Sequence, residues 1–130
     1  MSDHPNVQRM RDGYDAFAKG DLPALRELLT EDVVWHVPGH TSLAGDYEGI
    51  DDVLVFFVRV MEVTNGSFRV EPLTLLADDG YGQAPVSITA HRGDRHLDVM
   101  NLQVSRLRDC RVAEFWDTTT DPDATEAFYA

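Results

Sequence analysis

The second half of the chain carries the pattern that most restricts its fold, because its β segments are joined by turns of only a few residues. After Asn65-Gly66, segments rich in β-branched and apolar residues cover about 67–77, 83–92, 95–107 and 111–118. Short polar turns, such as Gly93-Asp94, separate them. Turns this short suit antiparallel hairpins, whereas parallel neighbours need long crossover connections. We therefore predict an antiparallel meander.

The first half of the chain has helical periodicity instead. Residues 5–19 place apolar side chains three and four positions apart, and Gly20 is a typical helix stop. Asp21 is a suitable N-cap for a short second helix over 22–29. The clearest amphipathic helix covers 50–61.

A single strand is predicted among these helices, at Val33 to Val37, followed by a loop or tight hairpin over 38–49. Asp121-Pro122 is typical of a final helix start. Helices first and strands afterwards indicate an α+β fold, and a length of 130 residues predicts one domain, 1–130.

Charge excludes two classes of partner. The chain has 11 Lys and Arg against 23 Asp and Glu, a formal net charge of −12. Such a chain repels phosphates, so we expect neither nucleic-acid binding nor attachment to anionic membranes. The longest apolar run, Val53 to Val58, is too short to span a bilayer. Cys110 is the single cysteine, and Met1 to Pro5 lack a signal-peptide pattern, so we expect a cytoplasmic protein.

The order of elements and four sequence motifs resemble one known family. The chain resembles the SnoaL-like group of the nuclear transport factor 2-like (NTF2-like) superfamily, which includes ketosteroid isomerases. The resemblance implies a cone-shaped α+β barrel, with N-terminal helices packed on a curved, mainly antiparallel sheet around a pocket. Members include polyketide cyclases, isomerases, epoxide hydrolases, dehydratases and non-catalytic binding domains. The matching motifs are Phe17–Asp21, Glu31–Gly39, Ala44–Gly49 and Cys110–Asp117.

The expected hairpin at Gly93-Asp94 fixes which side chains share a face. A two-residue turn places one set together by strand alternation: Val86, Ile88, Ala90, Leu97, Val99, Asn101 and Gln103. The resemblance makes this the concave face and directs Phe115, Asp117, Val33, Trp35 and Val37 inward as well. We expect Asp117 to be the only acidic residue in the cavity, which favours a neutral or weakly acidic ligand.

Two known chemistries of the superfamily do not fit the sequence. Ketosteroid isomerases use a tyrosine and two aspartates, whose positions here fall on Gly13, Val37 and Gln103. Epoxide hydrolases of the limonene type pair an arginine with two aspartates, whereas the inward pair here is Val99 and Asn101. We therefore expect neither machinery.

The SnoaL-type cyclases use an aspartate late in the sheet, and Asp117 matches that position. A carboxyl group in an apolar cavity has a raised pKa and suits general acid/base catalysis. Asn101 and Gln103 would donate hydrogen bonds to an enolate oxygen. The alternative is that Asp117 only binds backbone N–H groups in a non-catalytic binding domain. The expected ligand is a small apolar organic molecule without cofactor or metal, contacted by Trp35, Val37, His40, Tyr47, Val99 and Phe115.

The side chains on the other face of the meander indicate a surface where two copies of the chain would meet. Met100, Leu102 and Val104 lie on it and are apolar enough for a homodimer contact. His91 and His96 lie nearly opposite each other there, but no further ligands follow at a spacing that would complete a metal site. His36 is also expected to face away from the cavity.

Overall fold

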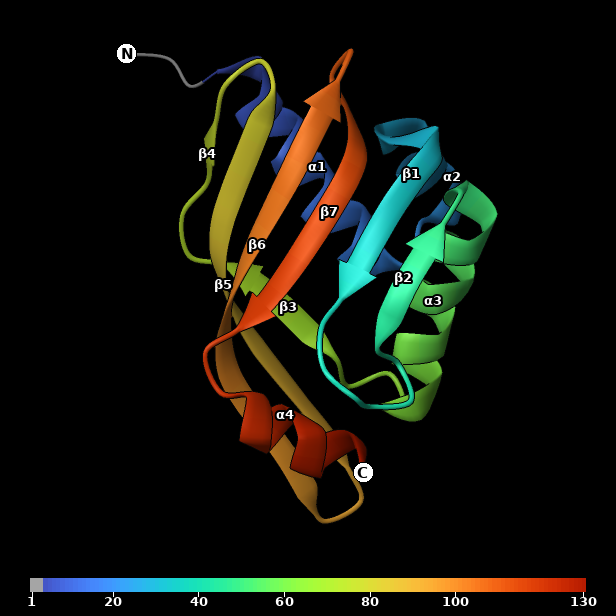
Figure 1. Ribbon diagram of the computed structural model, residues 1–130, viewed down its shortest axis with the longest axis vertical. Helices are drawn as coiled ribbons and strands as arrows, with labels where there is room; N and C mark the ends of the chain where they lie inside the picture. Colours follow the sequence, from blue (N-terminus) through green and yellow to red (C-terminus); the bar gives the residue numbers. More distant parts are fainter. Residues whose placement is uncertain (1–3) are drawn as a thin grey trace.

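The computed structural model describes residues 4–130, and Figure 1 shows its arrangement. Residues 1–3, which belong to the segment compared with signal peptides above, lie outside the described part. The helices are α1 (Pro5–Lys19), α2 (Leu22–Leu28), α3 (Ile50–Val63) and α4 (Pro122–Tyr129). The strands are β1 (Leu29–Val37), β2 (Gly45–Glu48), β3 (Arg69–Pro72), β4 (Leu76–Ala77), β5 (Tyr81–Arg92), β6 (Arg95–Arg108) and β7 (Arg111–Thr119).

The helix ends follow the predicted capping chemistry. Gly20 adopts a left-handed conformation, with φ of 66°, and ends α1. The side chain of Asp21 accepts a hydrogen bond from the Ala24 N–H at 3.1 Å and so caps α2. Asp121 caps α4 in the same way through the Ala124 N–H at 3.0 Å. These caps confirm three helix starts or stops predicted from sequence.

The strands form one mixed sheet in the order β2-β1-β7-β6-β5-β3, with β4 also paired to β5. All neighbours are antiparallel except β1 and β7, which run parallel. The α+β architecture is therefore as predicted. The sheet is open, however, and is not a closed barrel. Its edge strands β2 and β3 pair with no further strand among residues 4–130, and α3 and α1 pack against these two edges.

One local prediction is made more specific and another needs correction. The segment predicted as a loop or tight hairpin over 38–49 is a hairpin, because Gly45 to Glu48 form β2 and pair antiparallel with β1 after a connection over 38–44. The single strand predicted over 67–77 is two short strands, β3 and β4, interrupted after Pro72. Proline has no N–H to donate to a ladder, which favours a break there.

The hairpin register is as predicted, and it sets which side chains are buried. Arg92 pairs with Arg95, and Ile88 pairs with Val99. All seven side chains predicted for the concave face are buried. Figure 1 shows α1, α2 and α3 on one side of the curved sheet and α4 across the far end of the β5–β6 hairpin. The buried apolar residues form two clusters, one around α2, α3 and β1 and one around α1, β5, β6 and α4.

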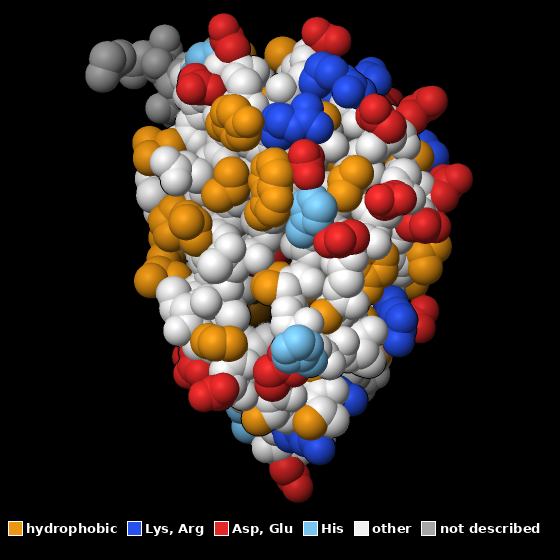
Figure 2. Space-filling model, in the orientation of Figure 1, with side chains coloured by type: hydrophobic (Ala, Val, Ile, Leu, Met, Phe, Trp, Pro, Cys, Tyr) orange, Lys and Arg blue, Asp and Glu red, His pale blue; other side chains and the backbone are white. Residues whose placement is uncertain are grey.

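The outer face of the sheet carries the residues predicted to point away from the core. Met100 and Leu102 are 46% and 40% exposed. Figure 2 shows hydrophobic side chains on this face, interspersed with charged ones. His36 lies between two carboxylates, with Nδ1 at 2.7 Å from Asp46 and Nε2 at 2.6 Å from Glu114. This bridge links β2, β1 and β7 on the side away from the cavity.

Candidate functional site

Two adjoining cavities lie on the concave side of the sheet. The outer chamber, of about 110 Å³, lies between β6, β7, α4 and the loop after β1 and is lined by residues including Val37, Val99, Asn101, Glu126 and Tyr129. The inner chamber, of about 130 Å³, lies under α1 and is lined by residues including Tyr14, Phe17, Trp35, Gln103 and Phe115. Four side chains line both chambers: Phe56, Val60, Phe68 and Asp117. Each chamber is somewhat smaller than the roughly 150 Å³ cavity that holds a benzene ring.

Asp117 is the polar group at the junction of the chambers. It lies on β7 directly opposite Gln103 on β6. Its Oδ1 accepts hydrogen bonds from Asn101 Nδ2 at 3.0 Å and from Gln103 Nε2 at 3.4 Å. Burial raises the pKa of the Asp117 carboxyl, and the two amides and the Thr118 N–H oppose that rise. The structure thus brings together the three residues predicted to act in catalysis.

Tyr14 belongs to the same hydrogen-bonded chain, although the sequence reasoning passed over it. Its hydroxyl donates to Gln103 Oε1 at 2.7 Å. Burial, and secondarily the charge of Asp117, raise the pKa of the Tyr14 phenol. The superfamily's tyrosine position aligned with Gly13, one residue earlier, and both residues line the inner chamber. The spacing of Tyr14 with Met10 and Phe17 on one helical face was the available signal.

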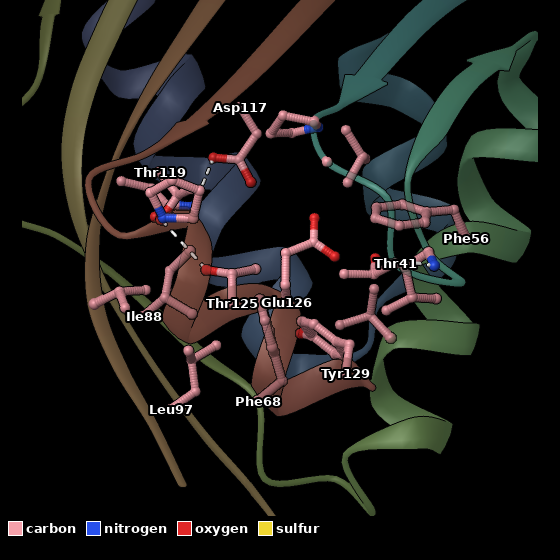
Figure 3. A pocket seen from close by; sticks show the side chains of 18 residues that line it. Thr41, Phe56, Phe68, Ile88, Leu97, Asp117, Thr119, Thr125, Glu126 and Tyr129 are labelled. Atoms are coloured by element: carbon pink, nitrogen blue, oxygen red, sulfur yellow. Dashed lines mark hydrogen bonds between the residues drawn. The ribbon is translucent and has the colours of Figure 1, made fainter.

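The outer chamber contains polar groups from α4, as Figure 3 shows. Glu126 and Asp117 direct their carboxyl groups into this chamber from opposite sides. The expectation that Asp117 is the only acidic residue in the cavity is therefore wrong. Burial, together with the charge of Asp117, raises the pKa of Tyr129 to about 12. Arg92 Nη1 anchors the end of α4 by donating to the Phe128 carbonyl at 2.8 Å.

Asn101 leaves one acceptor free at the chamber wall. The residue is only 6% exposed, and its Oδ1 has no hydrogen-bond partner within residues 4–130. Its amide orientation follows from the hydrogen bond that Nδ2 donates to Asp117. A buried acceptor without a partner costs free energy, but this oxygen has almost no accessible surface, so a ligand donor would reach it only after the amide turns.

Four of the six residues predicted to contact a ligand line one of the two chambers. Val37 and Val99 line the outer chamber, while Trp35 and Phe115 line the inner one. The two aromatic rings stack with centroids 3.6 Å apart. The remaining two predicted contacts, Tyr47 and His40, lie outside both linings. The Tyr47 hydroxyl donates to the Leu43 carbonyl at 2.7 Å, and His40 is exposed on the loop after β1.

No group of three or more His, Cys, Asp or Glu within residues 4–130 is arranged to hold a metal ion. Over the same range, every helix is too short or too polar to cross a bilayer.

Comparison with known proteins identifies the family. The family model for the SnoaL-like domain matches residues 10–115. The chain belongs to the SnoaL-like family. Its architecture is that of NTF2-like proteins, as predicted.

Individual relatives of this SnoaL-like chain cover its whole length. Uncharacterized protein Rv0034 of Mycobacterium tuberculosis is 32% identical, with 100% of both chains covered. The solved structure of Bal32a, from a soil-derived mobile gene cassette, is 34% identical with a TM-score of 0.92, covering 96% of each chain. IdmH from Streptomyces antibioticus, a proposed polyketide cyclase, shares the fold at 20% identity and a TM-score of 0.76, covering 91% of this chain and 94% of IdmH.

Proposed function

We propose that this SnoaL-like protein binds a small, mostly apolar organic molecule and transfers protons to and from it through Asp117, without a cofactor. The reaction class is a cyclisation or isomerisation of a carbonyl compound. The observation that carries the proposal is the buried Asp117 carboxyl at the junction of two largely apolar chambers. Membership in a family that includes polyketide cyclases supports the same class of substrate, as does the fold shared with IdmH.

The proposed steps balance in protons. The Asp117 carboxylate removes a proton from the carbon next to a ligand carbonyl, and an enolate forms. In a cyclisation, the enolate carbon bonds to a second carbonyl carbon of the same ligand, and the resulting alkoxide takes the proton back from Asp117. In an isomerisation, the proton returns to a different carbon. The raised pKa of Asp117 brings it nearer to the working pH, which favours both directions of transfer.

Hydrogen-bond donors stand near the position where negative charge would form. The Asn101 and Gln103 amides already donate to Asp117, and the Tyr14 phenol donates to Gln103. Tyr14 and Gln103 could turn toward an enolate oxygen in the inner chamber and stabilise it. We place this activity in the cytoplasm, consistent with the single cysteine, Cys110.

The test uses a bicyclic ketone whose α-protons exchange slowly in water. 1-Tetralone is incubated with the protein in D2O, and deuterium incorporation at the α-carbon is followed by NMR. Asp117→Asn is expected to slow the protein-dependent exchange by about 100-fold or more, because a positioned acid/base contributes roughly 10² to 10⁴ in rate. Asp98→Asn, the same change on the exposed outer face of β6, is the control and should leave the rate unchanged.

A non-catalytic binding domain is the second candidate. It is favoured by the residues at the isomerase positions, since Gly13, Val37 and Gln103 replace the tyrosine and both aspartates. Binding of the ketone, measured by calorimetry, with exchange that is the same in wild type and Asp117→Asn would support this candidate and exclude the catalytic one.

A further inference from the structure

We propose that the ligand is elongated and lies across both chambers, with a hydrogen-bond-donating or cationic head in the outer chamber and an apolar body in the inner one. Glu126 is the residue that determines this preference. The inference rests on the proposed function only in taking the same cavity as the ligand site. It adds the class of ligand, its orientation and a specificity residue.

The lining of the outer chamber includes hydrogen-bond acceptors from Asn101, Asp117 and Glu126, although the buried Asn101 Oδ1 would have to turn to meet a ligand. The carboxyl groups of Asp117 and Glu126 face the same space from β7 and α4 (Figure 3). Among the described residues that line this chamber, none is Lys, Arg or His. A ligand group with N–H or O–H donors would satisfy these oxygens, whereas a carboxylate would meet like charge.

The inner chamber differs in that its main polar groups already bind one another. The Tyr14 hydroxyl donates to Gln103, and Gln103 donates to Asp117. The remaining walls are largely apolar, with Phe17, Trp35 and Phe115 among them, although Arg9 and Ser105 also line this chamber. Such a space favours the apolar part of a ligand.

The dimensions favour a ligand in two parts. Each chamber alone is somewhat smaller than a cavity that holds one benzene ring, and the two share the walls formed by Phe56, Val60, Phe68 and Asp117. The boundary is thus made of side chains, which can change rotamer without moving a strand. A ligand with two rings, or a ring and a short chain, would fill both chambers and place a central atom beside Asp117.

Glu126 is held in place by the loop after β1. Its Oε1 accepts a hydrogen bond from the His40 backbone N–H at 2.7 Å. At Gly39, where φ is 97°, a side chain would collide with the same carboxyl oxygen. The loop therefore packs directly on Glu126 and fixes the carboxyl at the chamber wall. A glutamine in its place keeps the shape and an acceptor for His40 but removes the charge.

The experiment compares three biphenyl probes of matched size by isothermal titration calorimetry. Their 4-substituents are aminomethyl, hydroxymethyl and carboxylate. Wild type should bind the ammonium most tightly and the carboxylate most weakly. Glu126→Gln should reduce the ratio of their dissociation constants on the order of tenfold, since one charge is removed from a partly buried site. Asp123→Asn, an exposed position on the same helix, controls for net charge and should leave the ratio unchanged. Glu126→Asp, which keeps the charge, should retain most of the preference and shows that the effect is not a folding defect.

Three results would overturn the inference: an unchanged ratio in Glu126→Gln, tightest binding of the carboxylate probe, or no binding of any biphenyl. Tight carboxylate binding would indicate the reverse orientation, with the head near Arg9 at the inner chamber. These outcomes are separable from failure of the proposed catalysis. Loss of head-group preference with Asp117-dependent exchange intact refutes only the present inference. Retained preference with exchange that ignores Asp117 refutes only the catalytic role.

Discussion

Gly13 tests whether a glycine that leaves room in the inner chamber lowers the stability of α1. The residue lies in the interior of α1 and lines the inner chamber. A Cβ built there would have Leu28 Cδ1 as its nearest neighbour, at 4.0 Å, which is ordinary van der Waals contact. Gly13→Ala is therefore sterically acceptable, and the backbone conformation does not require glycine.

The magnitude follows from helix propensity. Alanine is favoured over glycine in a helix interior by about 0.8 to 1.0 kcal/mol. The main reason is that an unfolded chain with alanine has less conformational freedom to lose on folding than one with glycine. The added methyl contacts Leu28 without strain and should contribute little more, since it borders a cavity. We expect Gly13→Ala to raise the free energy of unfolding by about 1 kcal/mol, equivalent to about 3–5 °C in Tm.

Gly20→Ala is the matched control. A Cβ at Gly20 would meet nothing within 4 Å, but the residue has φ of 66° as the C-cap of α1. Alanine in this left-handed conformation costs about 1 kcal/mol. The two substitutions should thus change stability in opposite directions. Urea denaturation followed by circular dichroism measures both. Destabilisation by Gly13→Ala, or equal signs for the two variants, would refute the reasoning.

Two further predictions concern the outer face. Hydrogen bonds from His36 to Glu114 first and Asp46 second raise the pKa of its imidazole. The stabilisation that protonated His36 gives the folded protein is therefore complete below the unfolded-state pKa of about 6.5 and is lost as pH rises through the folded-state pKa. His36→Gln should lower the urea midpoint more at pH 6 than at pH 9. Equal losses at the two pH values would contradict the proposed bridge. The exposed side chains of Met100 and Leu102 favour a homodimer that forms through this face. Sedimentation should give a dimer for the wild type at micromolar concentration and a monomer for Leu102→Lys. A wild-type monomer would count against the homodimer.

The sequence was most informative where alternation and turn length act together. The two-residue turn at Gly93-Asp94 fixed the β5–β6 register, and that register placed Asn101 and Gln103 on the concave face. These are local rules of strand geometry, so one sequence sufficed for them. The concavity of this face and the inward direction of Asp117, which lies opposite Gln103, came instead from the resemblance to the SnoaL-like group.

The missing parts of the site depend on contacts between distant segments. Glu126 and Tyr129 line the outer chamber because α4 folds back over the end of the β5–β6 hairpin, which no local pattern specifies. His40 was expected at the ligand for its side chain, yet it contributes its backbone N–H to Glu126. Tyr47 turns its hydroxyl to Leu43 because β2 pairs with β1, in a segment whose pattern indicated a loop or tight hairpin but not which side chains would face the cavity.

The parallel pairing of β1 with β7 also determines when the chambers can exist during folding. Trp35 lies beside Phe115, so an early strand can complete the sheet only after nearly the whole chain has been made. Contacts between such distant segments are slow to form because the intervening chain must first lose its freedom. The α1–α2 pair and the β5–β6 hairpin can form earlier from local contacts. Asp117 lies on β7, which forms a local hairpin with β6, whereas Trp35 on β1 joins that hairpin only through the long-range pairing. A ligand that contacts both strands would therefore stabilise the state in which β1 has paired.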